Sequence, residues 1–194
     1  MHHIYTTKAL IIKSVPIGEA NKYYFLLTED LGFVKATAQG VRLEKSKLKG
    51  HLQEFCSVKI SMVKGKSTWR ITGVETIENG DLLKNINKLI AIKNIFSLLL
   101  RLLHGEEKNE PLFKSVGSFY NFLIKNELTQ NNIKNLETIT VLRILYHLGY
   151  FKKTFELFDF VKNNELSIDI LNIFENNKKI AILDINNALN ETHL

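Results

Sequence analysis

Residues 58–74 read VKISMVKGKSTWRITGV, and this stretch decides the fold of the first part of the chain. Apolar residues alternate with polar ones as far as Met62, and the alternation resumes at Trp69 and Ile71. Between the two runs, Lys64-Gly65-Lys66-Ser67 has the composition of a tight turn. Because side chains of a strand point to opposite faces in turn, the stretch predicts a β-hairpin with one buried face.

Three shorter runs upstream have the same character. Residues 9–15 (ALIIKSV), 23–28 (YYFLLT) and 33–38 (FVKATA) are rich in β-branched and aromatic residues and are separated by glycine-containing turns. Residues 46–52 are expected to form one or two helical turns between the third and fourth strands. Five short strands with a small helix at that point are the order of an oligonucleotide-binding (OB) barrel.

After residue 80 the apolar period becomes helical. Residues spaced i, i+3 and i+4 predict helices over 82–103, 110–123, 133–148 and 151–161, with weaker signals near 168–175 and 184–192. The turn sequence Glu78-Asn79-Gly80-Asp81 stands where the period changes. The sequence therefore predicts an α+β protein of two domains, with an OB-fold five-stranded β-barrel in 1–79 and an all-α helical bundle in 80–194.

Positive charge is concentrated in the first of these predicted domains. Residues 1–80 contain 12 lysines and arginines against 7 acidic residues, whereas residues 81–194 contain 14 against 13. Within residues 35–70 the ratio is nine to two. This excess favours an anionic partner such as nucleic acid, although an ordinary solvated surface in a lysine-rich chain has the same composition.

The residues that carry catalysis in known motifs do not occur in a recognisable pattern. Cys56 is the only cysteine, the six histidines lack metal-ligand spacing, and no phosphate-binding glycine loop or serine elbow is present. We therefore expect no catalytic residues, no metal site and no cofactor, and a binding protein rather than an enzyme. The apolar stretch 89–103 is short and interrupted by charges, so we expect no membrane segment and a cytoplasmic location.

The basic stretch 39–51 provides most of the candidate nucleic-acid contacts. Its cations lie on a loop and short helix from which they can flank one groove, and nearby aromatic rings can stack on bases. Small barrels also bury several aromatic rings in their cores, so only one exposed stacking ring is expected, either Tyr23 or Trp69. The predicted DNA-binding residues are Tyr23, Lys35, Arg42, Lys45, Lys47, Lys49, His51 and Trp69.

Several short motifs resemble those of bacterial RecO proteins. The opening residues 9–13, the Gly18-Glu19-Ala20 turn and residues 26–32 are similar to the start of that family. Residues 38–55, with Gly40-Val41-Arg42 followed by KSKL and LQEF, resemble its most recognisable stretch, and residues 142–150 resemble a helix that ends in Leu-Gly-Tyr. The chain is thus similar to a short form of RecO, because it lacks the zinc-site cysteines that many relatives carry after this helix.

The resemblance implies a DNA repair and recombination mediator of the RecF pathway. Such a protein binds single- and double-stranded DNA, anneals complementary strands and assists recombinase loading at the nucleoid. The implied partners are RecR and the C-terminal tail of the single-stranded-DNA-binding protein. A tail of that kind needs an apolar groove beside a cation, for which the candidates are Arg143, Tyr146, Tyr150, Phe151 and Lys152. Core packing accounts for these aromatic residues equally well.

Three other functions fit the same residues. An RNA-binding OB protein linked to translation or ribosome assembly would carry the same basic segment, and would bind RNA more tightly than DNA at equal salt. A protein–protein adaptor would use the barrel only as a scaffold and would respond weakly to oligonucleotides of any length. An enzyme with an unrecognised site would lose an activity when one residue is changed.

Overall fold

The computed structural model describes residues 3–78, 85–151 and 155–191 of the 194-residue chain. The described residues form two compact units. The first contains residues 3–78 and 103–110, and the second contains residues 85–102, 111–151 and 155–191. The proposed domain boundary between residues 79 and 80 lies outside the described residues and stays a prediction.

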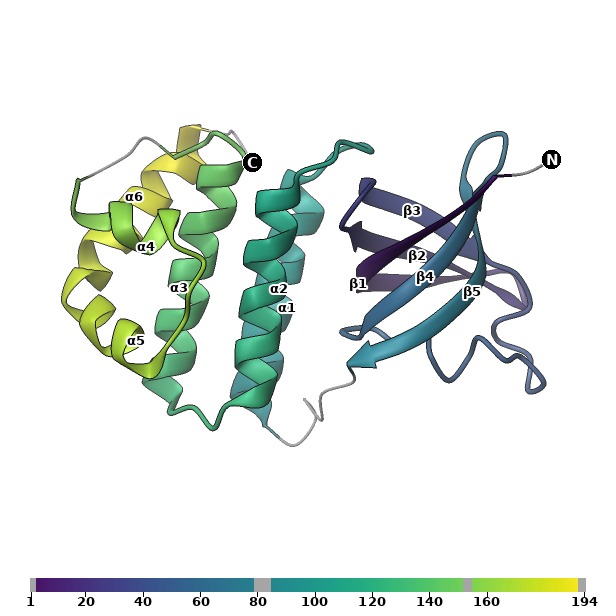
Figure 1. The fold of residues 1–194 in the computed structure, drawn as a ribbon, viewed down its shortest axis with the longest axis horizontal. Helices are drawn as coiled ribbons and strands as arrows, with labels where there is room; N and C mark the ends of the chain where they lie inside the picture. The colour runs from purple at the N-terminus through teal and green to yellow at the C-terminus, as the bar shows by residue number, and fades with distance from the viewer. Residues whose placement is uncertain (1–2, 79–84, 152–154, 192–194) are drawn as a thin grey trace. The chain divides into compact units, whose positions relative to one another are not determined.

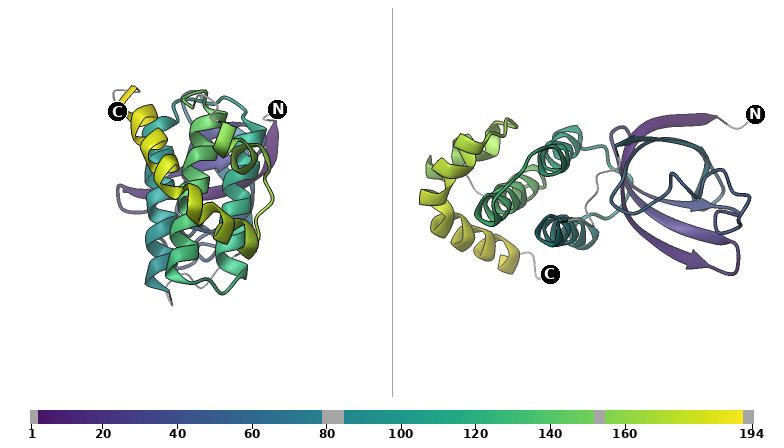
Figure 2. Two further views of the ribbon diagram at one scale, coloured as in Figure 1. Left: turned by 90° about the vertical axis from the view of Figure 1, so that its left-hand side faces the viewer. Right: turned by 90° about the horizontal axis from the view of Figure 1, so that it is seen from below.

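Five strands of the first unit form a closed barrel in the order β1-β2-β3-β5-β4 (Figure 1). They are β1 (Ile4–Ile17), β2 (Asn21–Thr28), β3 (Gly32–Ala38), β4 (Ser57–Lys64) and β5 (Trp69–Glu78). The predicted five-stranded OB-type barrel is therefore confirmed, as is the hairpin formed by residues 58–74. The right-hand view in Figure 2 shows these strands curling around a common centre.

Two local features allow the sheet to close. The strand β1 is 14 residues long and pairs antiparallel with both β2 and β4, and its register with β2 shifts between Ile11 and Lys13. Such a bulge bends a strand and increases its twist. The barrel is closed by a short parallel contact between β3 and β5, in which Ala36 pairs with Trp69 and Thr37 with Arg70.

The inner face of the barrel is apolar because of the two-residue period of its strands. Tyr24 and Leu26 of β2 point inward, whereas their neighbours Tyr23 and Phe25 remain half-buried on the outer face. The buried cluster consists of Ala9, Ile11, Tyr24, Leu26, Val34, Ala36, Ala38, Val41, Leu52, Cys56, Val58, Ile60, Met62, Trp69 and Ile71. Burial, with the Glu54 charge as a second cause, raises the pKa of Tyr24 to about 12.

The segment between β3 and β4 differs from the prediction. Residues 39–56 are all described, and they form a series of turns rather than a regular helix. At the predicted position, the N–H groups of Lys49 and His51 donate to the carbonyls three residues before them, at 3.3 and 3.2 Å. The Leu52 N–H donates to the Leu48 carbonyl, four residues before it, at 3.0 Å. An isolated helix this short is unstable in water, so the side chains of Val41 and Leu52 hold the segment against the core instead.

Residues 103–110 belong to the barrel unit although they lie between two helices in the sequence. The main chain of Glu107 passes so close to Gly32 that a β-carbon on that glycine would lie 2.0 Å from the Glu107 carbonyl oxygen. The Lys108 ammonium also lies 3.6 Å from a carboxylate oxygen of Asp30. Residues 103–110 therefore pack against the turn before β3.

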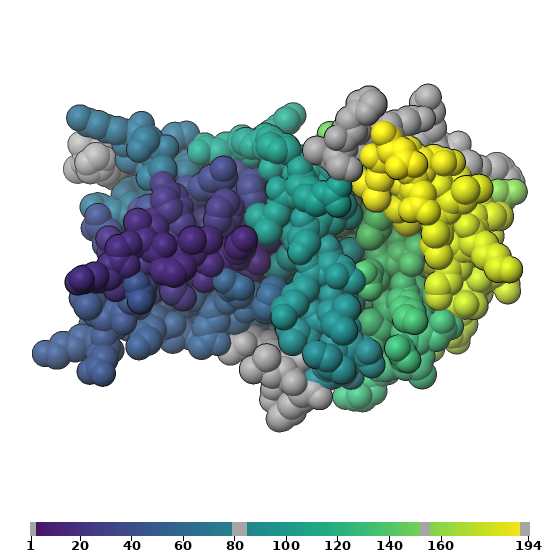
Figure 3. Space-filling view, turned by 180° about the vertical axis from the view of Figure 1, so that it is seen from behind, coloured from purple at the N-terminus to yellow at the C-terminus, as the bar shows by residue number. Residues whose placement is uncertain are grey.

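The second unit consists of helices, as the sequence predicts. They are α1 (Ile86–Leu102), α2 (Glu110–Lys125, whose first residue is grouped with the barrel), α3 (Gln130–His147), α4 (Phe158–Lys162), α5 (Ile168–Phe174) and α6 (Lys178–Glu191), with short 3-10 turns η2 (Phe155–Leu157) and η3 (Glu175–Asn177). Helix α3 contacts α1, α4, α5 and α6, and Figure 3 shows the yellow α6 beside the green α3. The expected fourth helix over 151–161 is thus, in its described part, a 3-10 turn followed by one short helix.

Candidate nucleic-acid interface

The outer face of β2 and β3 displays aromatic and cationic side chains together. Their antiparallel register pairs Tyr23 with Thr37 and Phe25 with Lys35, so these four residues share the face opposite the core. The rings of Phe25 and Phe33 are roughly parallel, with centroids 6.2 Å apart and an interplanar angle of 29°. The Lys35 ammonium lies 5.7 Å from the centre of the Phe25 ring, within the range of a cation–π contact.

A pocket of about 430 Å³ opens at this face. Residues of β2 and β3 line it together with residues 103–106 and the hairpin residues Ser67 and Thr68. All of these residues belong to the barrel unit. Its lining consists of Tyr23, Phe25, Phe33, Lys35, Ser67, Thr68, Leu103, His104, Gly105 and Glu106.

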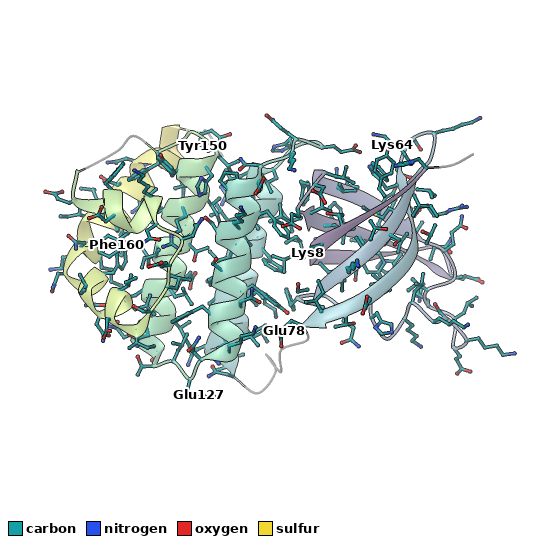
Figure 4. The ribbon with its side chains drawn as sticks, viewed as in Figure 1. Lys8, Lys64, Glu78, Glu127, Tyr150 and Phe160 are labelled. Atoms are coloured by element: carbon teal, nitrogen blue, oxygen red, sulfur yellow. The ribbon has the colours of Figure 1, made fainter. Side chains whose placement is uncertain are left out.

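The β4–β5 hairpin forms a second pocket, of about 260 Å³, with a cationic lining. Lys64, Lys66 and Arg70 line it together with the hydroxyl-bearing residues Ser67 and Thr68. The turn is tight, since the Gly65 N–H donates to the Thr68 carbonyl at 3.0 Å. Figure 4 labels Lys64 at the end of β4, where this hairpin begins. Because Ser67 and Thr68 line both pockets, the aromatic pocket on β2 and β3 adjoins the cationic pocket of the hairpin.

Glu106 lines the aromatic pocket and pairs with Lys64, which lines the cationic pocket. One of its carboxylate oxygens accepts a hydrogen bond from the indole N–H of Trp69 at 2.8 Å, and the other lies 2.8 Å from the Lys64 ammonium. The hydrogen bond from Lys64 is the largest influence on this carboxyl and, with that from Trp69, holds the pKa of Glu106 below its usual value. The negative charge of Glu106 is therefore offset by Lys64, a cation of the neighbouring pocket.

Trp69 is not the exposed stacking ring that the sequence allowed. Only 2% of its surface is exposed, and it belongs to the barrel core. Its ring packs edge-on against Tyr5 at 5.1 Å, and its only polar atom donates to Glu106. The alternation of Trp69 with Ile71 is the sequence signal for this position, because both residues share the inward face of β5. Of the two predicted stacking residues, Tyr23 is the one that lines the pocket.

The predicted cations of the 39–51 loop are dispersed. Lys45 and Lys47 are exposed, and the Arg42 guanidinium donates to the Gly18 carbonyl at 2.7 Å. Lys49 lines a separate pocket of mixed charge that also contains Lys22, Glu44 and Glu54.

His51, also exposed, makes a 2.9 Å hydrogen bond to Thr76. Lys35 is the predicted cation that the structure places beside Tyr23. Lys64, Lys66 and Arg70 are not among the predicted site residues, because the sequence indicates a turn at Lys64–Ser67 and a strand from Trp69.

The predicted partner-binding residues of the helical unit do not all face outward. Arg143 is 1% exposed, and its guanidinium donates to the backbone carbonyls of Phe160, Asn163 and Glu165. Burial lowers the pKa of Arg143 to about 10. Arg143 therefore fixes the loop after α4 and is not placed to hold a peptide carboxylate, because its donors are directed into the protein.

The other members of that set are divided. Tyr150 is 39% exposed, Phe151 is buried, and Tyr146 is half-buried with its ring edge-on to His147. Lys152 lies outside the described residues. Tyr150, labelled in Figure 4, is thus the most accessible of the four described residues in this set.

The described parts of the chain contain neither a metal-ligand cluster nor a membrane-spanning helix. In residues 3–78, 85–151 and 155–191, no three side chains of His, Cys, Asp or Glu are grouped as metal ligands would be. Among the same residues, no helix combines the length and apolar character required to cross a bilayer.

The fold and this surface define a class of two-domain proteins, in which an OB-type barrel precedes a helical domain. Residues 1–79 match the family model described as "Recombination protein O N terminal". The chain is 34% identical over 149 residues to a DNA repair protein RecO of Clostridium novyi, a match that covers 76% of this chain and 57% of that protein. Residues 1–79 therefore carry the N-terminal domain of RecO proteins, and the chain is similar to a RecO protein over 149 of its residues.

Other relatives match over shorter segments. The DNA repair protein RecO of Dehalococcoides mccartyi is 42% identical over 77 residues, which are 40% of this chain and 30% of that protein. That of Gloeothece citriformis is 30% identical over 115 residues, or 59% and 41% of the two chains. The matched segments thus span about a third to somewhat over half of these relatives' length.

Proposed function

We propose that this chain acts in DNA repair and recombination by binding DNA, and that single strands lie across β2–β3 and the β4–β5 hairpin. The adjoining aromatic and cationic pockets carry the proposal. Cations neutralise backbone phosphates and release counterions, and exposed rings stack on unpaired bases. The same face of OB barrels, with the loop between strands 4 and 5, commonly binds oligonucleotides.

The chain would act by binding rather than by catalysis. Annealing of complementary strands needs no active site, because a basic surface lowers the repulsion between two polyanions and base pairing supplies the free energy. Binding of duplex DNA would use the cations without the aromatic pocket. Such a protein would work at the nucleoid in the cytoplasm.

Recombinase loading and the partners RecR and the single-stranded-DNA-binding protein's tail are proposed on the similarity to RecO proteins alone. Because Arg143 is engaged inside the helical unit, we propose that any tail-binding site on this unit uses other cations. Anisotropy with a labelled tail peptide tests this assignment. We expect an Arg143→Ala variant that remains folded to bind the peptide as the wild type does, whereas a specific loss of affinity would restore Arg143 as a ligand.

The location of the DNA site is tested by two variants that remove equal charge. One carries Lys66→Ala and Arg70→Ala in the hairpin, and the other carries Lys45→Ala and Lys47→Ala in the 39–51 loop. Both lower the net charge by two, so a general electrostatic effect is the same in each. Fluorescence anisotropy with labelled single-stranded DNA, duplex DNA and RNA of equal length, titrated over salt, measures the difference.

We expect the hairpin variant to lose affinity for single-stranded DNA and to reduce the log–log salt slope by about 1.4, two contacts at about 0.7 each. The loop variant should change the slope less. Equal effects of the two variants would remove the hairpin from the site. Clearly tighter binding of RNA than of DNA would favour the translation-linked alternative, and a weak, length-independent response would favour an adaptor.

A further inference from the structure

The pocket lined by β2, β3 and residues 103–106 has the chemistry of a site for one flat ligand. Among its aromatic residues, Phe33 is 6% exposed, whereas Tyr23 and Phe25 are half-buried. Three aromatic side chains thus border one space, and two of them, Phe25 and Phe33, stack at an interplanar angle of 29°. Aromatic faces of this kind pack well against another ring.

The rim of the same pocket is polar. Ser67 and Thr68 provide hydroxyl groups, Glu106 provides a carboxylate and Lys35 provides an ammonium. A ligand with an apolar face and a hydrogen-bonding edge satisfies both parts of the lining, which an aliphatic side chain does not. The volume of about 430 Å³ lies in the range of small-molecule pockets and accommodates a base with its sugar.

The neighbouring cationic pocket identifies what the flat ligand is attached to. Lys64, Lys66 and Arg70 line the pocket that shares Ser67 and Thr68 with the aromatic pocket, so a ligand that fills the aromatic pocket has positive charge next to it. Glu106 is the one acidic group in the described linings of the two pockets, and its charge is matched by Lys64. This charge pattern fits a ligand that is linked to phosphates better than it fits an acidic peptide.

We infer that the pocket holds one unstacked base of a single strand, while the hairpin cations hold the adjoining phosphates. The inference rests on the proposed function and deepens it, because it assigns a base-binding pocket that is bordered by residues 103–106. A base inside a duplex is stacked on both sides and cannot enter without being extruded. The pocket therefore distinguishes single strands from duplex by geometry, whereas the cations bind both.

The test compares two strands that have the same number of phosphates. The full-length chain is titrated with a short labelled oligothymidine and with an oligomer of the same length in which every position is abasic. Stacking strengths of single bases correspond to about 5- to 150-fold in affinity, so we expect the wild type to prefer the base-bearing strand by about tenfold. Tyr23→Ala should reduce this preference to about two- or threefold, and Tyr23→Phe should retain it.

Tyr150→Ala is the matched control, because Tyr150 is a 39% exposed aromatic residue of the helical unit and is outside the pocket lining. It should leave the preference unchanged. Phe25→Ala is a second pocket variant, used if Tyr23→Ala unfolds the barrel. A wild type that binds both strands equally, or a preference that persists in folded Tyr23→Ala and Phe25→Ala, would overturn the base pocket and leave the space to a peptide side chain. Absence of salt-sensitive binding to either strand would instead refute the proposed function itself.

Discussion

Arg143 and Trp69 show how a polar side chain becomes part of a core. The Arg143 guanidinium donates to backbone carbonyls, and the Trp69 indole N–H donates to the Glu106 carboxylate. A buried donor without an acceptor is costly, so these hydrogen bonds are a condition of burial. The sequence predicts both residues as ligand contacts, because it shows that their side chains are donors. It does not show whether acceptors inside the protein are available to them.

Replacement of Arg143 should therefore affect stability. Arg143→Ala removes donors to three carbonyls and leaves a cavity in the helical unit, at an expected cost of roughly 2–4 kcal/mol in the free energy of unfolding. Arg101→Ala, at an exposed position in the last turn of α1, should change it by less than about 0.5 kcal/mol. Urea unfolding followed by circular dichroism measures both. Similar stabilities of the two variants would show that Arg143 does not fix the loop.

At the scale of single elements, the sequence predicted the strands well because their period is local. The β4–β5 hairpin follows from its alternation and its Lys64–Ser67 turn, and the end of α3 follows from the leucine-rich run before Gly149. The segment between β3 and β4 was expected to contain a helix, but its apolar residues pack on the core without one. Local pattern cannot decide this, because the packing partners are distant in sequence.

The candidate site was predictable only in part. Tyr23 and Lys35 follow from the alternation of β2 and β3, since both occupy outward positions. The hairpin cations had a signal in the sequence, which is three cationic residues within seven positions around a glycine turn. The contribution of residues 103–106 had none, because those residues read as the end of one helix and the approach to the next.

The approach of residues 103–110 to the barrel can be tested at Gly32. This residue has φ +71°, and its missing β-carbon leaves room for the Glu107 carbonyl. Gly32→Ala should combine the left-handed backbone cost of about 1–2 kcal/mol with a steric clash that displaces the segment. Thermal unfolding and tryptophan fluorescence report the two effects.

Gly18→Ala is the control for the backbone cost alone. Gly18 has φ +55°, but a β-carbon there would meet nothing within 4 Å. It should lower stability by about 1–2 kcal/mol and leave the emission of Trp69 unchanged. If Gly32→Ala gave the same result as Gly18→Ala, the close approach of Glu107 would not be a feature of the protein in solution.

At the scale of the whole molecule, the barrel unit is assembled from two separate parts of the sequence. Glu106, which caps the indole of Trp69, comes from beyond α1. A cut at the proposed domain boundary therefore removes a piece of the barrel unit. The change of apolar period indicates where the strands give way to helices. It gives no sign that residues 103–110, which follow α1, belong to the barrel unit.

A fragment of residues 1–80 should accordingly fold less stably than the barrel in the full chain. Trp69 is the only tryptophan, so its emission reports on this position alone. We expect the fragment to show red-shifted emission and a lower unfolding midpoint, and full-length Glu106→Gln to show a smaller change in the same direction. Identical emission and midpoint in the fragment and the full chain would mean that residues 103–110 contribute nothing to the barrel.

The barrel is closed at β3 and β5 by two residue pairs, whereas β2 and β3 share seven. This short parallel join lies at Thr37 and Arg70, which also line the cationic pocket. Local opening of a protein begins where few contacts must break, so amide protons along this join are expected to exchange with solvent sooner than those between β2 and β3. A strand of DNA bound across the hairpin would hold β3 and β5 together. Its binding would be measured as slower deuterium uptake by the amides of these paired residues.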